Sequence, residues 1–202
     1  MHKVFISYYH AADQKYKDKL VSLAEKEQIF IDGSVDTGDI DDEGMSDEAI
    51  RVKIRDEYLR ETSVTIVLVG PETKTRKHVD WEIYSSMYNG KKNKKSGIIV
   101  IYLPSVQDTG HVHIGHGQKE KELVHPTISN WVSVNSRAEY EKRHPHLPDR
   151  IIDNLLVNDS HISILKWQDL TVEGLKNLID YAYEDRLNSK YDLSRPMRRR
   201  NG

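Results

Sequence analysis

SVTIVLV, residues 63–69, is the strongest strand-forming stretch of this chain. Valine and isoleucine favour strands, and the apolar side chains here would cover both faces of the strand. Strands that are apolar on both faces are typical of parallel sheets with helices packed on each side. Gly70 and Pro71 follow at once and end the stretch. The stretch therefore predicts a central strand of an α/β fold.

Strands and helices alternate on both sides of this stretch. We predict further strands at residues 3–8, 28–31, 98–103 and 161–167, and helices at residues 13–27, 45–61, 78–89 and 171–188, with Asp13 and Thr171 as helix caps. This alternation predicts a flavodoxin-like, doubly wound α/β fold with a five-stranded, mostly parallel sheet. Such sheets bind ligands at the carboxyl ends of their strands, so we look for chemistry in the loops after residues 8, 32 and 70.

The 202 residues fit a single domain, which we place at residues 1–190. Residues 104–160 interrupt the alternation and predict a long, polar insertion before the last strand, with short helices at 137–142 and 148–157. Residues 191–202 are basic and predict a disordered tail.

Composition excludes several classes of protein. The formal net charge is −2, so charge gives no reason to expect nucleic-acid binding. The chain has no cysteine, which excludes disulfides, thiolate metal sites and a cysteine nucleophile. No apolar run approaches the roughly 20 residues that cross a bilayer. We therefore expect a cytoplasmic protein with no membrane partner.

Three segments occur together in a characteristic order. The first strand ends in FISYYH (residues 5–10), a glycine-rich and acidic loop follows at residues 32–44, and the helix after Gly70 contains RKHVDWEI (residues 76–83). In this order and spacing the chain resembles the TIR-like family of the Thoeris antiphage defence protein ThsB. The resemblance covers roughly residues 3–103 and implies the same flavodoxin-like fold.

The resemblance also implies a set of site residues. The catalytic glutamate of the family corresponds to Glu82, and the aromatic residue just before it corresponds to Trp81. The loop beside the bound nucleotide corresponds to Ser7, Tyr8 and His10, and the loop after the second strand corresponds to residues 33–43, where Asp36 and Asp39 could contact ribose hydroxyls. Many TIR enzymes have a tryptophan four residues before the glutamate, whereas this chain has His78.

The activity that the resemblance implies is cleavage of the nicotinamide–ribose bond of NAD. Nicotinamide departs from a cationic pyridinium and therefore needs no proton from a general acid. One carboxylate beside the oxocarbenium ion that develops on the ribose can then suffice. Water would then give ADP-ribose, and a hydroxyl of the same molecule would give a cyclic ADP-ribose signal. NAD is the substrate, and no cofactor or metal is expected. The expected partners are further copies of the chain, through TIR contacts, and a downstream effector reached by the diffusible product.

Other interpretations of the same residues stay open. Glu82 could be a surface residue paired with Arg76 or Lys77, and strand alternation puts only one of Tyr8 and Tyr9 on a given face. The chain could be a non-catalytic TIR-like assembly module. It could also be a nucleoside deoxyribosyltransferase-like enzyme, whose glutamate attacks an anomeric carbon. A phosphoacceptor receiver domain is excluded because residues 68–71 read LVGP and lack the required aspartate.

Two further segments are better explained as polar surface. GHVHIGHG (residues 110–117) offers His111, His113 and His116 at alternating positions, which suits a metal, but no carboxylate pattern completes a known site. The basic runs at 91–95 and 195–200 are solvated surface in this interpretation.

Overall fold

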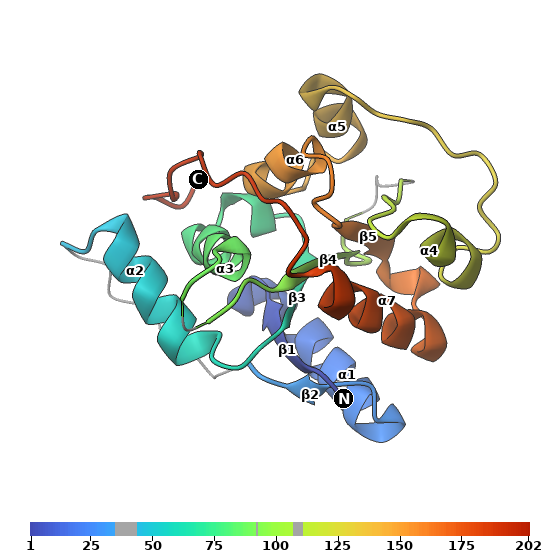
Figure 1. Cartoon of the computed structure of the whole chain (residues 1–202), viewed down its shortest axis with the longest axis horizontal. Helices are drawn as coiled ribbons and strands as arrows, with labels where there is room; N and C mark the ends of the chain where they lie inside the picture. Colours follow the sequence, from blue (N-terminus) through green and yellow to red (C-terminus); the bar gives the residue numbers. More distant parts are fainter. Residues whose placement is uncertain (35–43, 92, 107–110) are drawn as a thin grey trace.

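The computed structural model describes residues 1–34, 44–91, 93–106 and 111–202, and Figure 1 shows their arrangement. Within these residues the chain forms a five-stranded, all-parallel sheet with the strand order β2-β1-β3-β4-β5. The strands are β1 (Lys3–Ser7), β2 (Ile31–Asp32), β3 (Val64–Val69), β4 (Gly97–Tyr102) and β5 (Ser163–Lys166). The predicted flavodoxin-like α/β class is confirmed, and the SVTIVLV stretch supplies the middle strand, every residue of which is buried.

Helices fill most of the connections between the strands. They are α1 (His10–Glu27), α2 (Asp47–Lys53), α3 (Lys77–Met87), α4 (Gly117–Leu123), α5 (Arg137–Arg143), α6 (Asp149–Leu155) and α7 (Val172–Asp185). α2 continues as a π-helical turn over Ile54–Tyr58, and short 3₁₀ turns cover Thr73–Thr75 and Trp167–Asp169. Within the described parts of the chain, no helix is both long and apolar enough to cross a bilayer.

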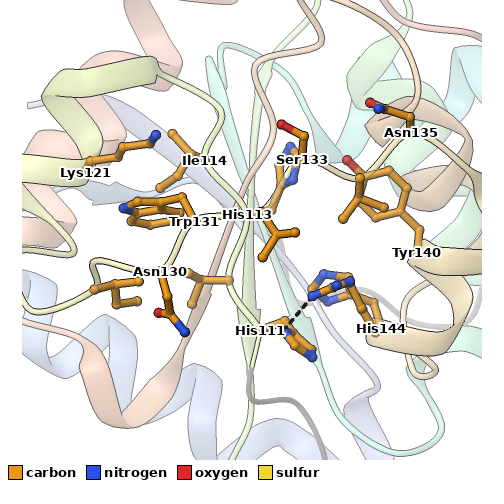
Figure 2. Close-up of a pocket in the computed structure, with 15 residues that line it drawn as sticks. His111, His113, Ile114, Lys121, Asn130, Trp131, Ser133, Asn135, Tyr140 and His144 are labelled. Atoms are coloured by element: carbon orange, nitrogen blue, oxygen red, sulfur yellow. Dashed lines mark hydrogen bonds between the residues drawn. The ribbon is translucent and has the colours of Figure 1, made fainter.

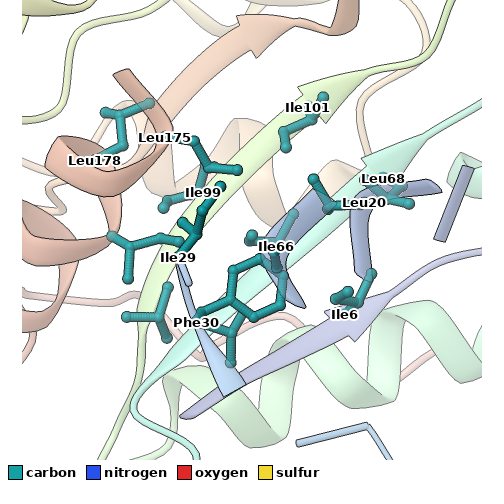
Figure 3. Close-up of a cluster of buried hydrophobic side chains, with 14 of the residues drawn as sticks. Ile6, Leu20, Ile29, Phe30, Ile66, Leu68, Ile99, Ile101, Leu175 and Leu178 are labelled. Carbon is teal, nitrogen blue, oxygen red and sulfur yellow. The ribbon is translucent and has the colours of Figure 1, made fainter. Parts of the chain in front are cut away.

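α1 and α7 cover one face of the sheet. Figure 3 shows Ile6, Ile66 and Ile99 on three neighbouring strands, with Leu20 of α1 and Leu175 of α7 packed against them. α7 is amphipathic and begins with a side-chain cap, because Thr171 accepts a hydrogen bond from the backbone N–H of Gly174, as the sequence predicts. Burial of this apolar surface is the main contribution to the stability of this layer.

α3 lies against the opposite face, and α2, α6 and the C-terminal segment surround it (Figure 1). Eight of its eleven residues are buried, among them Trp81 and Glu82. A helix that is buried nearly all round has no polar face to give to solvent. Asp80, Glu82 and Ser86 of this helix are hydrogen-bonded inside the protein, which is the setting of the candidate site.

Two of the differences between the observed structure and the sequence prediction concern Asp13 and the C-terminal residues. Asp13 does not cap a helix: α1 begins earlier, at His10, and the Asp13 carboxylate is buried against Gly70, where a Cβ would lie 2.5 Å from Oδ2. The residues from 191 onward were expected to be disordered, but they follow α3 closely, with Met197 only 3% exposed. The tail carries apolar and hydrogen-bonding groups that match α3, and its composition alone does not reveal this match.

Gly97 permits the close approach of α7 to the sheet. A Cβ at this position would lie 2.1 Å from the backbone oxygen of Ala182, and backbone cannot move aside as a side chain can. We expect Gly97→Ala to lower the free energy of unfolding by about 1–3 kcal/mol, because the helix must shift off β4. Urea denaturation would measure this effect. Gly44→Ala is a contrasting variant, since its Cβ meets nothing and only the positive φ of 73° opposes it; equal losses in the two variants would contradict the packing explanation.

Candidate active site

The centre of the candidate site is a hydrogen bond between two residues 75 positions apart. The Ser7 hydroxyl donates to Oε2 of Glu82 over 2.6 Å, and both side chains are buried. Ser7 is the last residue of β1, and Glu82 lies in the middle of α3, the helix that follows β3. The bond therefore lies at the carboxyl edge of the sheet, where a doubly wound fold binds its ligands.

Burial changes the acidity of Glu82. Its side chain is 9% exposed, and the loss of hydration raises the pKa from 4.5 to about 8, while the hydrogen bond from Ser7 acts in the opposite direction. A carboxyl group with this pKa changes charge near neutral pH. Perturbed acids in such positions are typical of functional sites. Glu82 is therefore not the surface residue of the alternative interpretation, and Arg76 pairs instead with Glu72.

Tyr58 lies near this carboxylate, and Arg76 contacts Tyr9 at the start of the same helix. Tyr58 is at the end of the π-helical turn. Burial raises its pKa most, followed by the charge of Glu57 and then that of Glu82, so Tyr58 is close enough to feel the Glu82 carboxylate. The Arg76 guanidinium lies over the ring of Tyr9, 4.0 Å from its centre, at the start of α3. Sequence reasoning did not single out Tyr58 or Arg76 for this site. The only signal for Tyr58 is its place in the apolar stripe of the helix predicted at 45–61, a segment that packs on α3.

Tyr8 and His10 are less directly connected to Glu82. Tyr8 is 6% exposed and belongs to the core under α1, on the opposite face of β1 from Ser7. Its hydroxyl donates to Gln14 over 2.6 Å, and its ring stacks on that of His10 at 4.3 Å. His10 is exposed at the start of α1. The pair lies at the edge of the site, and Tyr8 is held there by core packing.

Trp81 is part of the core. It is fully buried with Phe5, Ile50 and Ile54, and its indole N–H donates to the backbone oxygen of Arg198 over 2.8 Å. A ring enclosed in this way has no face left for a ligand to stack on. His78, which stands where many TIR enzymes have tryptophan, contacts Trp81 edge-on at 4.9 Å. The structure therefore brings Ser7 together with Glu82 and encloses Trp81 in the core. Asp36 and Asp39 lie outside the described residues.

The sequence offers the histidines of the insertion as metal ligands, and among the described residues one group has ligand atoms close enough together to hold a metal ion. Ligand atoms of His116, His161 and Asp185 all lie within 4.8 Å of one another. Nδ1 of His116 already lies 2.6 Å from the Asp185 carboxylate, so this contact does not require an ion. His111 and His113 are elsewhere, lining a pocket with His144. Only one of the three histidines considered therefore belongs to the metal-like group.

An all-parallel sheet of order β2-β1-β3-β4-β5, with a buried glutamate of α3 bonded to the end of β1, gives a flavodoxin-like fold of the kind that TIR-like domains have. A family model described as "Thoeris protein ThsB, TIR-like domain" matches residues 5–108, just over half of the chain. The chain therefore belongs to this family, and it is a TIR-like protein of a defence-related family. No curated protein and no solved structure matched the chain.

Proposed function

We propose that this protein cleaves the nicotinamide–ribose bond of NAD with Glu82 as the catalytic residue, and that the products act in antiphage defence. The single observation that supports the proposal is the buried Glu82 carboxyl held by Ser7 at the carboxyl edge of the sheet. A carboxylate poised there can stabilise the positive charge that develops on the ribose as neutral nicotinamide leaves. It can also orient a ribose hydroxyl or an incoming nucleophile.

The raised pKa of Glu82 fits a cationic substrate. In the unliganded protein, burial favours the neutral acid near neutral pH. A pyridinium beside the carboxyl would favour its charged form by simple attraction. The site would thus gain its charge when NAD binds, so no permanent counter-ion is required.

The proposal is tested by incubating NAD with the protein at high concentration and separating the products by chromatography. Nicotinamide release supports the proposal, and the second product distinguishes hydrolysis to ADP-ribose from cyclisation. High concentration matters because many TIR enzymes act only when assembled. Intact NAD under dilute and crowded conditions alike would contradict the proposal and favour the non-catalytic assembly module. Offering a purine deoxyribonucleoside in parallel tests the deoxyribosyltransferase alternative, which predicts release of the base.

The hydrogen bond from Ser7 opposes the effect of burial on the pKa of Glu82, and this gives a pH-dependent prediction. The hydroxyl donates to the carboxylate and so lowers its pKa, which means that Ser7→Ala should raise the pKa further. If Glu82 acts as the carboxylate, kcat/KM for nicotinamide release rises with pH through about 8 in the wild type. We expect this rising limb to move to higher pH in Ser7→Ala, with the largest loss near neutral pH and partial recovery in alkali.

Ser86→Ala is the matched control for this profile. Ser86 lies one turn further along α3 and bonds to Thr65 of β3 at 2.8 Å, so it loses a comparable buried hydroxyl away from Glu82. Its pH profile should keep the wild-type midpoint. A Ser7→Ala profile that falls equally at every pH would show that Ser7 does not act through the charge of Glu82.

A further inference from the structure

The insertion before β5 forms a pocket of its own. It has a volume of about 630 Å³, within the range of roughly 300–1,000 Å³ that small-molecule sites occupy. Its described lining residues all lie between His111 and His144, within the insertion predicted at residues 104–160. The strand order puts β5 at the sheet edge, two strands away from β3 and three from β1. The pocket is therefore separate from the Glu82 site.

The walls of the pocket are fixed by the surrounding fold. His113 pairs with Ile164 through two backbone hydrogen bonds of 3.0 and 2.9 Å, which extends the sheet beyond β5. Tyr140 of α5 and His144, which follows that helix, are buried, and His144 is bonded through Nδ1 to the Tyr102 hydroxyl at 2.9 Å. Lys121 of α4 lies on the other side, as Figure 2 shows. A pocket with walls held in this way is largely formed before any ligand arrives.

The electrostatic character of the pocket favours an anion. Among the described residues that line it, Lys121 and Arg143 are cationic and none is an aspartate or a glutamate. Glu139 is not among the lining residues, and it accepts a hydrogen bond from Nε of Arg143 over 2.6 Å. Another nitrogen of the same guanidinium, Nη1, lies 3.4 Å from Nδ1 of His111. Burial lowers the pKa of His113 to about 4 and that of His144 to about 3, so both rings are neutral hydrogen-bonding groups near pH 7.

The same pocket offers aromatic surface. Trp131 is half-buried in the loop between α4 and α5, with the Lys121 ammonium 5.0 Å from its ring centre. Figure 2 shows Trp131 facing the cavity beside Lys121, with Tyr140 on the far side. Indole and phenol rings bind planar heterocycles by stacking, and cations beside them bind phosphate oxygens. Val132, 65% exposed, lies in the same loop and shows that this loop is surface and not core.

We propose that this pocket binds a phosphorylated nucleoside, with the base against Trp131 and the phosphates between Lys121 and Arg143. The ligand class follows from the combination of a stacking ring and two cations, with no carboxylate among the described lining residues, in one cavity of nucleotide size. Such a site, distinct from the Glu82 site, would let a nucleotide regulate the protein. The inference does not depend on NAD cleavage, since it concerns binding by a different part of the chain.

Isothermal titration of the full chain with ADP tests the proposal directly, with adenosine and pyrophosphate as separate half-ligands. We expect saturable binding of ADP that is at least about tenfold tighter than that of either half-ligand, because base and phosphates each contribute. Lys121→Gln and Trp131→Ala should each weaken ADP binding by about tenfold or more. Lys119→Gln is the matched control: it removes the same charge from α4, but its ammonium lies over Tyr181 of α7. It should leave the affinity unchanged.

ADP bound at the Glu82 site would add to the measured binding, so the contribution of that site to ADP binding is measured separately. Glu82→Gln should bind ADP as tightly as the wild type, and Trp131 should report the ligand by a change in fluorescence that is absent from Trp131→Phe. Three results would overturn the proposal: no saturable binding of ADP, equal weakening by Lys119→Gln and Lys121→Gln, or binding lost in Glu82→Gln alone. Because all of these readouts measure binding, a failure to cleave NAD leaves the test intact.

Discussion

Nicotinamide release from NAD is expected to fall by roughly 10²–10⁴-fold when Glu82 is replaced by glutamine. Glutamine has nearly the same shape, and its amide oxygen can still accept the hydrogen bond from Ser7. What it lacks is the negative charge that stabilises the oxocarbenium ion. The loss should therefore appear in kcat more than in KM, because the charge is needed most in the transition state. Chromatographic rates at saturating NAD measure it.

The thermal stability of Glu82→Gln shows whether its loss of activity has a structural cause. The folded-state pKa of Glu82 is raised, so folding favours the protonated acid, and that contribution is lost as pH rises from 4.5 through about 8. Glutamine does not ionise and avoids this loss. Thermal unfolding at pH 8 should therefore show Glu82→Gln to be at least as stable as the wild type. An inactive variant that also unfolds earlier would point to a structural role, and an active variant would exclude Glu82 as the catalytic group.

The sequence predicts the strands of the sheet well because the signal for each strand lies within its own few residues. The apolar strands at residues 63–69 and 98–103 and the capped helix after Thr171 each carry their own signal, and the structure confirms all three. The second strand was predicted at 28–31, whereas only Ile31 and Asp32 pair with β1. Ile29 and Phe30 are apolar because they enter the core, which periodicity cannot distinguish from strand pairing.

The site was only partly predictable for a geometric reason. Glu82 and Trp81 are adjacent, and a sequence motif treats them as one unit. In a helix, consecutive residues point about 100° apart, given 3.6 residues per turn. Glu82 meets Ser7, while Trp81 meets Ile50, Ile54 and the C-terminal segment. The position of that segment depends on contacts more than a hundred residues apart, such as the bond from Trp81 to Arg198, and no local pattern contains them.

The position of the C-terminal segment also explains why α3 can be buried on nearly every side. Residues beyond 194 cover the helix flank that the sheet and α2 leave open, and they bring backbone groups to its polar atoms. Arg198 donates its backbone N–H to Asp80 over 2.8 Å, and Gly202 donates to the backbone oxygen of Thr75, in the 3₁₀ turn just before α3, over 3.1 Å. Two parts of the fold thus position Glu82: β1, through the hydrogen bond from Ser7, and α3 itself, whose outer flank the C-terminal segment covers.

Arg150 is the main link in this covering, and Arg150→Met is expected to lower the free energy of unfolding by about 3–5 kcal/mol. Its guanidinium is fully buried and makes two hydrogen bonds to Asp80, of 2.9 and 3.1 Å. It also donates to the backbone oxygens of Arg195 and Pro196 over 2.9 and 3.2 Å. Methionine fills much of the volume but leaves a buried carboxylate and two carbonyls without this donor. Urea denaturation measures the loss.

The double variant Asp80→Asn with Arg150→Met separates the stranded charge from lost packing. If the uncompensated carboxylate dominates, asparagine removes the charge, and the double variant should recover a large part of the stability lost in Arg150→Met. Lys190→Met is the surface comparison, because its ion pair with Asp159 is exposed and its loss should leave the free energy of unfolding nearly unchanged. If the double variant is as unstable as the sum of its two single variants, the charge is not the cause, and Arg150 stabilises α3 by packing and by its hydrogen bonds to the C-terminal segment.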